Sequence, residues 1–213
     1  QRLRPASNMK VLTAVSALDL LGADYRFATT LQASGEPDDS ASVKNIYIRG
    51  GMDPLFGRDD LRSIIDALRQ YGVRHIAGDV VLDVTMKDTA TLGWGWCWDD
   101  KARPLTPLLY RRGNKFADHL LRALSEAGIT VGGFVRNGVA PNSAPIWLMR
   151  THTIDQVLRP MMRESDNLCA ESLFFQLAAL SRRPYATYRD AAVQMSKLIS
   201  RWGIAPAEYK IAD

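Results

Sequence analysis

The stretch SNMKVLTAVSALDLL, residues 7–21, decides the fold. Apolar residues occupy nearly every face of this segment, which predicts a helix in the middle of a domain. Ser7 lies in the expected N-terminal cap region, with Pro5 just outside, and Gly22 is placed to end the helix. Lys10 falls within this apolar helix, so we expect it in a poorly solvated environment.

Ser7 and Lys10 form an S-x-x-K pattern, the only one in the chain. Positions three apart on a helix share a face, so the lysine nitrogen can reach the serine Oγ. A base must take the serine proton to make a good nucleophile, and an apolar environment favours the neutral amine that can do so. A helix N-terminus would also favour developing negative charge. The alternative is a capping serine beside a solvent-facing lysine, and the pattern alone does not exclude it.

Ser165-Asp166-Asn167 is the second motif, and it stands between two predicted helices. Ser165 could pass a proton to a leaving amine, and Asn167 could hold a substrate amide in register. The alternative is an N-cap cluster, because all three residue types favour that position. Capping and catalysis do not exclude each other.

S-x-x-K on a buried helix with a downstream S-D-N is the signature of serine penicillin-binding enzymes. The sequence resembles the low-molecular-mass class C penicillin-binding proteins, the D-alanyl-D-alanine carboxypeptidases. Four ordered landmarks carry this resemblance: the nucleophile motif at 4–10, a glycine–Asp-Pro loop at 50–54, a Trp-rich segment at 93–100, and the S-D-N motif at 164–171. The resemblance extends from Arg4 to Asp213.

The resemblance implies a role for each motif residue. Ser7 would attack the carbonyl of the penultimate D-alanine, with Lys10 as base and its own backbone N–H as one oxyanion donor. Ser165 would relay the proton, and Asn167 would bind the substrate amide. Asp100, with Asp99 as the next choice, would reach the free amine of diaminopimelate; the alternative is an acidic residue that caps a turn. β-Lactams would acylate the same serine, and neither a cofactor nor a metal is implied.

The fold class expected is α+β: the helical part of a β-lactamase/transpeptidase-like domain with a strand-rich α/β domain inserted between the two motifs. Residues 1–24 and 146–213 would form the incomplete penicillin-binding domain, and residues 25–145 the insertion. Class A β-lactamases also carry S-x-x-K and S-D-N, but in them the two motifs lie much closer together. They resemble this chain less, because 158 residues separate Ser7 from Ser165 here. The periodicity predicts strands at 26–33, 43–49, 75–84, 129–135 and 146–150, and further helices at 59–71, 115–127, 154–164, 167–181 and 188–202.

No Lys-Thr-Gly sequence, the family's third motif, occurs in the chain. We therefore expect a fragment with little or no carboxypeptidase activity alone, from a parent protein that has it. Two alternatives stay open: a β-lactamase or penicillin-recognising esterase, and a degenerate non-catalytic module that binds peptidoglycan. Whether the parent trims terminal D-alanine or cleaves crosslinks as an endopeptidase also stays open.

Composition is that of an ordinary globular protein, 46% hydrophobic and 23% charged, with a net charge of +4. The basic residues are scattered, so nucleic acid is not expected as a partner. The resemblance implies peptidoglycan stem peptides and β-lactam antibiotics as partners. No apolar run is long enough for a membrane span, while peripheral membrane association and oligomeric state stay open. The resemblance implies a periplasmic or extracytoplasmic location, and because the chain opens at Gln1 without an initiator Met, we expect a signal peptide to have been removed or left out. Cys97 and Cys169 match no metal spacing, and their pairing stays open.

Overall fold

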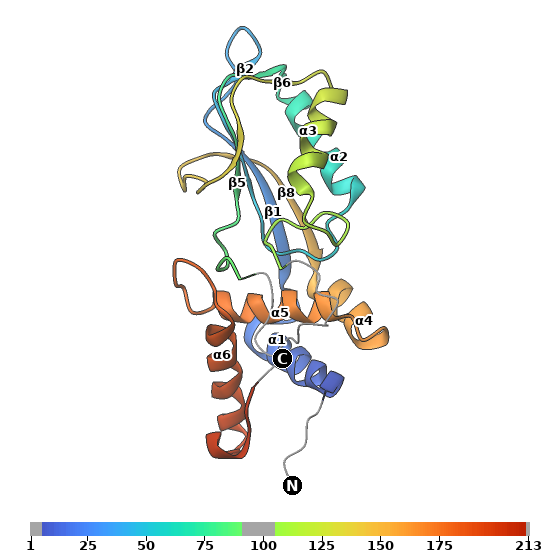
Figure 1. The fold of residues 1–213 in the computed structure, drawn as a ribbon, viewed down its shortest axis with the longest axis vertical. Helices are drawn as coiled ribbons and strands as arrows, with labels where there is room; N and C mark the ends of the chain where they lie inside the picture. Colours follow the sequence, from blue (N-terminus) through green and yellow to red (C-terminus); the bar gives the residue numbers. More distant parts are fainter. Residues whose placement is uncertain (1–5, 91–104, 212–213) are drawn as a thin grey trace. The chain divides into compact units, whose positions relative to one another are not determined.

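The computed structural model describes residues 6–90 and 105–211. The chain divides into two compact units. Unit 1 comprises Gln1–Arg26, Met86–Leu105 and Thr153–Asp213, and unit 2 comprises Phe27–Thr85 and Thr106–His152. Helices and strands are both abundant among the described residues, so the expected α+β class is confirmed (Figure 1).

Unit 1 is helical in its described part. Its helices pack around α5, which contacts α1, α4 and α6. Ten residues of α5 are buried, as a helix that is apolar on every face requires. The elements are the 3-10 turn η1 (Ala6–Asn8), α1 (Met9–Leu21), α4 (Ile154–Arg163), α5 (Asn167–Ala179), α6 (Tyr188–Arg201) and the 3-10 turn η2 (Pro206–Glu208).

Helix α1 differs from its prediction in two respects. Its N-cap is Asn8, and Ser7 lies one residue earlier in η1, so the α-helix begins at Met9, two residues later than predicted. The predicted burial of every face is also wrong, because a stripe of three side chains is 41–51% exposed: Val11, Val15 and Leu18. Gly22 does end the helix, with φ of 89°.

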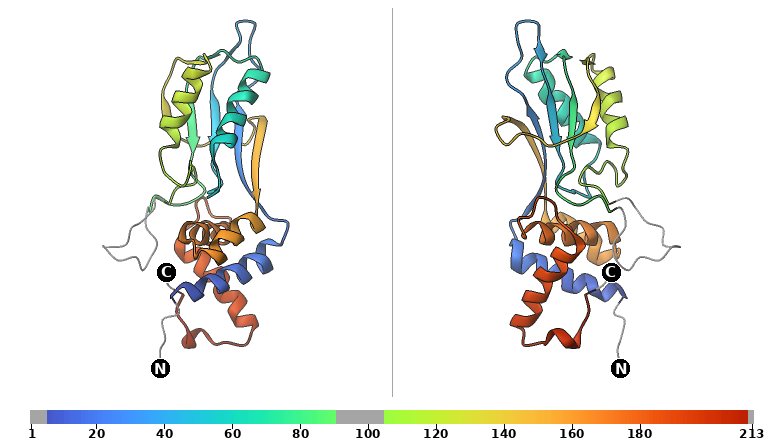
Figure 2. Two further views of the ribbon diagram at one scale, coloured as in Figure 1. Left: turned by 90° about the vertical axis from the view of Figure 1, so that its right-hand side faces the viewer. Right: turned by 60° about the vertical axis from the view of Figure 1, so that its left-hand side comes forward.

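Unit 2 is built on a five-stranded sheet in the order β7-β5-β3-β1-β8. Strands β3, β5 and β7 run parallel, and β1 is antiparallel to β3. The helices α2 (Arg58–Gln70) and α3 (Phe116–Glu126) connect the parallel strands and cover one face of the sheet; both lie in front of it in the left view of Figure 2. The strands are β1 (Arg26–Ala33), β3 (Ile46–Arg49), β5 (Val80–Asp83), β7 (Val135–Asn137) and β8 (Ile146–Thr153).

The core of unit 2 lies between this sheet and the two helices. Helix α2 contributes the predicted stripe of Leu61, Ile64, Ile65 and Leu68, all buried. The other large contributors include Leu31, Ile46, Ile48, Leu82, Phe116 and Leu120. Within the parts of the chain that the structure describes, no helix is long and apolar enough to span a membrane.

Three predicted strands, 43–49, 75–84 and 129–135, are each broken in two, which corrects the expectation of continuous strands. Their first halves form a separate parallel sheet, and their second halves are β3, β5 and β7. The small sheet has the order β2-β4-β6, with β2 (Ser42–Val43), β4 (His75–Ile76) and β6 (Thr130–Val131).

Side chains and glycines at the break explain it. The Asn45 Oδ1 accepts a hydrogen bond from the Asp79 N–H at 2.7 Å, and the Asp79 Oδ1 accepts one from the Phe134 N–H at 3.0 Å. Two backbone N–H groups at this level are thus bonded to side chains, while backbone hydrogen bonds continue beside them, as from the Gly133 N–H to the Gly78 carbonyl oxygen at 2.9 Å. A Cβ on Gly133 would lie 2.5 Å from the Gly78 carbonyl oxygen, so only glycine allows this approach.

Candidate active site

Ser7 and Lys10 meet at the start of α1. The 3-10 turn η1 carries Ser7, and the first turn of α1 carries Lys10. The Lys10 Nζ lies 3.3 Å from the Ser7 Oγ. Lys10 is buried, with 9% of its surface exposed, whereas Ser7 is exposed. The nucleophile candidate is therefore accessible while its amine neighbour is not.

Asn167 fixes the position of the lysine amine. It is the first residue of α5, and its Oδ1 accepts a hydrogen bond from the Lys10 Nζ at 2.6 Å. Helices α1 and α5 pack against each other, so this bond joins two elements of the same core. The Lys10 Nζ is thus held between the Asn167 amide and the Ser7 hydroxyl.

Ser165 approaches the same hydroxyl from the other motif. Its Oγ donates a hydrogen bond to the Ser7 Oγ at 2.9 Å. The backbone of Ser165 has φ of 55°, the left-handed region that residues other than glycine rarely adopt. Strain of this kind costs roughly 1–3 kcal/mol and is concentrated at functional sites. The loop therefore holds the Ser165 hydroxyl in place at some cost in stability.

The central residue of the S-D-N motif has a structural role. Asp166 is the N-cap of α5, and its Oδ1 accepts a hydrogen bond from the Cys169 N–H at 3.0 Å. The cap holds the helix start that bears Asn167. The capping interpretation therefore holds for Asp166, while Ser165 and Asn167 form hydrogen bonds with the Ser7–Lys10 pair.

The arrangement suits acyl transfer. A serine hydroxyl has an amine within hydrogen-bond reach on one side and a second hydroxyl on the other, the geometry required of a nucleophile with its base and a proton relay. The described residues contain no group of three His, Cys, Asp or Glu side chains placed to hold a metal. Asp100, Asp99, Cys97 and the Trp-rich segment lie outside the described residues, while Cys169 is buried on α5.

The glycine–Asp-Pro loop belongs to unit 2 and is tightly packed there. A Cβ on Gly51 would lie 2.2 Å from the Ala28 carbonyl oxygen. The buried Asp53 accepts a hydrogen bond from the Leu55 N–H at 2.9 Å, and its Oδ2 lies 2.6 Å from the His152 Nδ1.

The pairing of His152 with Asp53 went unpredicted from the sequence, because 99 residues separate the two. Its hydrogen bond with Asp53 raises the pKa of His152 above the ordinary histidine value, against an opposing effect of burial. The second buried carboxylate of this cluster, Asp60, lies 2.9 Å from the Arg150 guanidinium. No local pattern marks these residues, and only the fold brings them together.

Two curated relatives match parts of the chain. The chain is 33% identical over 120 residues to a D-alanyl-D-alanine carboxypeptidase of Actinomadura sp. (strain R39), covering 54% of this chain and 22% of that protein. It is 35% identical over 95 residues to the D-alanyl-D-alanine carboxypeptidase DacB of Haemophilus influenzae, covering 45% of this chain and 20% of that protein. The matched part is about one fifth of each relative's length.

A solved structure shares the fold. The crystal structure of penicillin binding protein 4 (dacB) from Haemophilus influenzae has a TM-score of 0.91 at 21% identity, covering 99% of this chain and 65% of that chain. The same protein complexed with a novel β-lactam has a TM-score of 0.77 at 21% identity, covering 98% of this chain and 63% of that chain. At this identity the likeness establishes the fold.

The family resemblance predicted from the four landmarks is confirmed by a match over the whole chain. The sequence profile of the D-Ala-D-Ala carboxypeptidase 3 (S13) family matches residues 1–109 and 110–213. The chain therefore belongs to the D-Ala-D-Ala carboxypeptidase 3 (S13) family.

Proposed function

We propose that the protein containing this chain is a serine D,D-carboxypeptidase that acts on peptidoglycan stem peptides through a Ser7 acyl-enzyme. The observation that carries the proposal is the position of the Ser7 Oγ, 3.3 Å from the Lys10 Nζ and 2.9 Å from the Ser165 Oγ. Family membership and two relatives named as D-alanyl-D-alanine carboxypeptidases support the choice of substrate.

In the proposed reaction, the Ser7 Oγ bonds to the carbonyl carbon of the penultimate D-alanine while its proton moves to the Lys10 amine, the base of this step. The backbone N–H of Ser7 stabilises the oxyanion. The tetrahedral intermediate collapses as Ser165 gives its proton to the leaving nitrogen and takes up the proton held by Lys10, so the C–N bond breaks and the terminal D-alanine departs. Water then hydrolyses the ester and restores the Ser7 hydroxyl.

Asn167 would serve both the base and the substrate. Its Oδ1 accepts from the Lys10 Nζ, and an amide side chain has two further donors on Nδ2. Because Asn167 is exposed apart from this bond, its Nδ2 can donate to a carbonyl of the stem peptide. We therefore assign the substrate amide contact to the Nδ2 group.

Unit 1 would be part of the penicillin-binding domain and unit 2 its inserted domain. The stripe of Val11, Val15 and Leu18 supports an incomplete domain, because an apolar helix face this exposed calls for a covering layer. That layer would be the sheet that carries the third motif. The isolated 213-residue chain would then have the nucleophile and base but little or no turnover.

Asp100 would bind the free amine of diaminopimelate. A carboxylate beside an ammonium ion is the interaction that such recognition requires. Asp100→Asn should raise the KM for a stem peptide with a free side-chain amine and leave the KM for its N-acetylated form unchanged. Equal effects on the two peptides would contradict the assignment.

β-Lactams would be covalent ligands of the same serine, as a complex of the structurally similar penicillin binding protein 4 with a β-lactam supports. Since stem peptides lie outside the cytoplasmic membrane, a periplasmic or extracytoplasmic location follows from the proposal. Fractionation of cells that express the parent gene would test that location.

The test of the proposed function is release of D-alanine from a pentapeptide ending in D-Ala-D-Ala, using the parent protein through its third motif. We expect turnover that is lost in Ser7→Ala. Rapid hydrolysis of penicillin without release of D-alanine would instead indicate a β-lactamase. Absence of both reactions, with retained peptidoglycan binding, would indicate a non-catalytic module.

A further inference from the structure

Three arginines surround a pocket at the start of α2. The pocket measures about 450 Å³, and its wall is the segment 54–57 together with Arg58, Arg111 and Arg112. Pro54 and Phe56 are buried and give the wall an apolar part. The first backbone amides of a helix add partial positive charge at the same end. All of these residues belong to unit 2.

Arg111 and Arg112 occupy an unusual turn. Tyr110 and Gly113 exchange backbone hydrogen bonds of 2.9 and 3.0 Å, and the two arginines between them have φ of 48° and 66°. Positive φ at both central positions defines a type I′ turn, which favours Asn-Gly. Arginine is therefore a poor choice for the turn itself. Its presence at both positions calls for a role of the side chains.

The described carboxylates nearest this pocket have cationic partners of their own. Asp53 pairs with His152 and Asp60 with Arg150, while Asp59 lies 3.8 Å from the Arg62 guanidinium. Among the residues that the structure describes, no carboxylate is paired with Arg58 or Arg111. Arg58 and Arg111 thus present two guanidinium groups to the pocket beside carboxylates that already have cationic partners.

We propose that Arg58 and Arg111 bind an oxyanion in this pocket, the carboxylate or phosphate group of an anionic ligand. A guanidinium presents a planar fork of donors that matches both groups. Two sources could supply this chemistry: the carboxylates of a peptide and the phosphates of a phosphate-bearing polymer. The site does not depend on the proposed carboxypeptidase activity.

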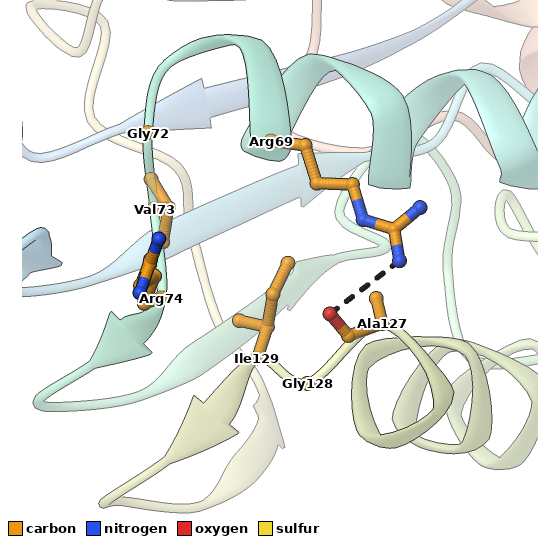
Figure 3. Close-up of a pocket in the computed structure, with 7 residues that line it drawn as sticks. All are labelled: Arg69, Gly72, Val73, Arg74, Ala127, Gly128 and Ile129. Carbon is orange, nitrogen blue, oxygen red and sulfur yellow. Dashed lines mark hydrogen bonds between the residues drawn. The ribbon is translucent and has the colours of Figure 1, made fainter.

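A second pocket provides a contrast within the same unit. It measures about 440 Å³ and is lined by Arg69, Arg74 and the residues that follow the ends of α2 and α3, namely Gly72, Val73, Ala127, Gly128 and Ile129 (Figure 3). Here the helices end, and their carbonyl oxygens carry partial negative charge. The Arg69 guanidinium already donates to the Ala127 carbonyl oxygen at 3.5 Å. We therefore expect an oxyanion to prefer the first pocket.

The test is an NMR titration of the 213-residue chain with inorganic phosphate and, separately, succinate at constant ionic strength. We expect saturable shifts of the Phe56, Gly57 and Arg111 amides, with a Kd on the order of 1 mM. Tighter binding of phosphate would point to a phosphate source, and tighter binding of succinate to a carboxylate source. Either result supports an oxyanion site.

The decisive variant is Arg111→Asn, because asparagine suits the turn better than arginine while it removes the cation. We expect at least about tenfold weaker binding with an unchanged or higher Tm. Arg58→Gln should weaken binding independently, and Arg69→Gln in the second pocket should leave it unchanged. No saturable shift in the wild-type chain, unchanged binding in Arg111→Asn, or loss of binding in Arg69→Gln would overturn the proposal.

Discussion

The Oγ atoms of Ser7 and Ser165 lie 2.9 Å apart, although 158 residues separate the two serines in the sequence. The packing of α1 against α5 brings them together, and both helices belong to unit 1. Most of the intervening chain forms unit 2. The site is therefore assembled from two distant segments of one helical unit.

Replacement of Ser165 should separate stability from acylation. Ser165→Gly removes the hydroxyl and also relieves the strain at φ of 55°, whereas Ser165→Ala removes the hydroxyl and keeps the strain. Both should slow acylation of the parent protein by penicillin by about 10²-fold or more. Glycine should give the higher free energy of unfolding, by about 0.5–1 kcal/mol. Stopped-flow acylation and urea denaturation measure the two effects, and unaltered acylation in both variants would exclude a proton relay.

Replacement of Lys10 distinguishes a base from a structural cation. Lys10→Arg supplies the charged donor that a purely structural role would need, but a guanidinium cannot accept the serine proton. We expect acylation at least about 10³-fold slower in this variant and in Lys10→Met. Circular dichroism would check that each variant folds. Near-normal acylation in Lys10→Arg would mean that only the charge matters.

The pair of His152 and Asp53 should make stability depend on pH. Because the folded state raises the pKa of His152, protonation favours folding. The stabilisation is complete below the pKa of histidine in the unfolded chain, about 6.5, and it is lost as the pH rises through the pKa of His152 in the folded state. The urea midpoint of the wild type should therefore fall over this range relative to that of Asp53→Asn. Parallel profiles for the two proteins would contradict the assignment.

The tight packing of the glycine–Asp-Pro loop predicts a difference between two glycines. A Cβ on Gly51 would lie 2.2 Å from the Ala28 carbonyl oxygen, while one on Gly57 meets its nearest neighbour at 3.6 Å. Gly51→Ala should destabilise the chain by at least about 2 kcal/mol, and Gly57→Ala by less than about 0.5 kcal/mol. Chemical denaturation measures both. Similar stabilities would show that the loop relaxes without cost.

Local patterns in the sequence predicted the elements well where one periodicity dominates. The stripe of Leu61, Ile64, Ile65 and Leu68 predicted α2 and its buried face. The breaks near Asn45, Asp79 and Gly133 escaped prediction, because β-branched residues on both sides resemble one continuous strand. Hydrogen bonds between neighbouring strands cause the breaks, and such contacts are not encoded in a local pattern.

The candidate site was predictable as residue types but not as geometry. The S-x-x-K spacing placed Lys10 near Ser7 through helix geometry alone. The contact between Asn167 and Lys10 depends on the packing of α5 against α1, which no spacing reveals. Hydrophobicity alone predicted that Val11 is buried, but its side chain is exposed. The difference arises because burial depends on which elements cover the helix.

The central claim is that Ser7 is the acylated nucleophile, and peptide mass spectrometry after incubation of the parent protein with penicillin G tests it most directly. We predict a stable adduct of one penicilloyl group on the peptide that contains Ser7, and its absence in Ser7→Ala. An adduct on Ser165 or on another serine, or an adduct that persists in Ser7→Ala, would contradict the account.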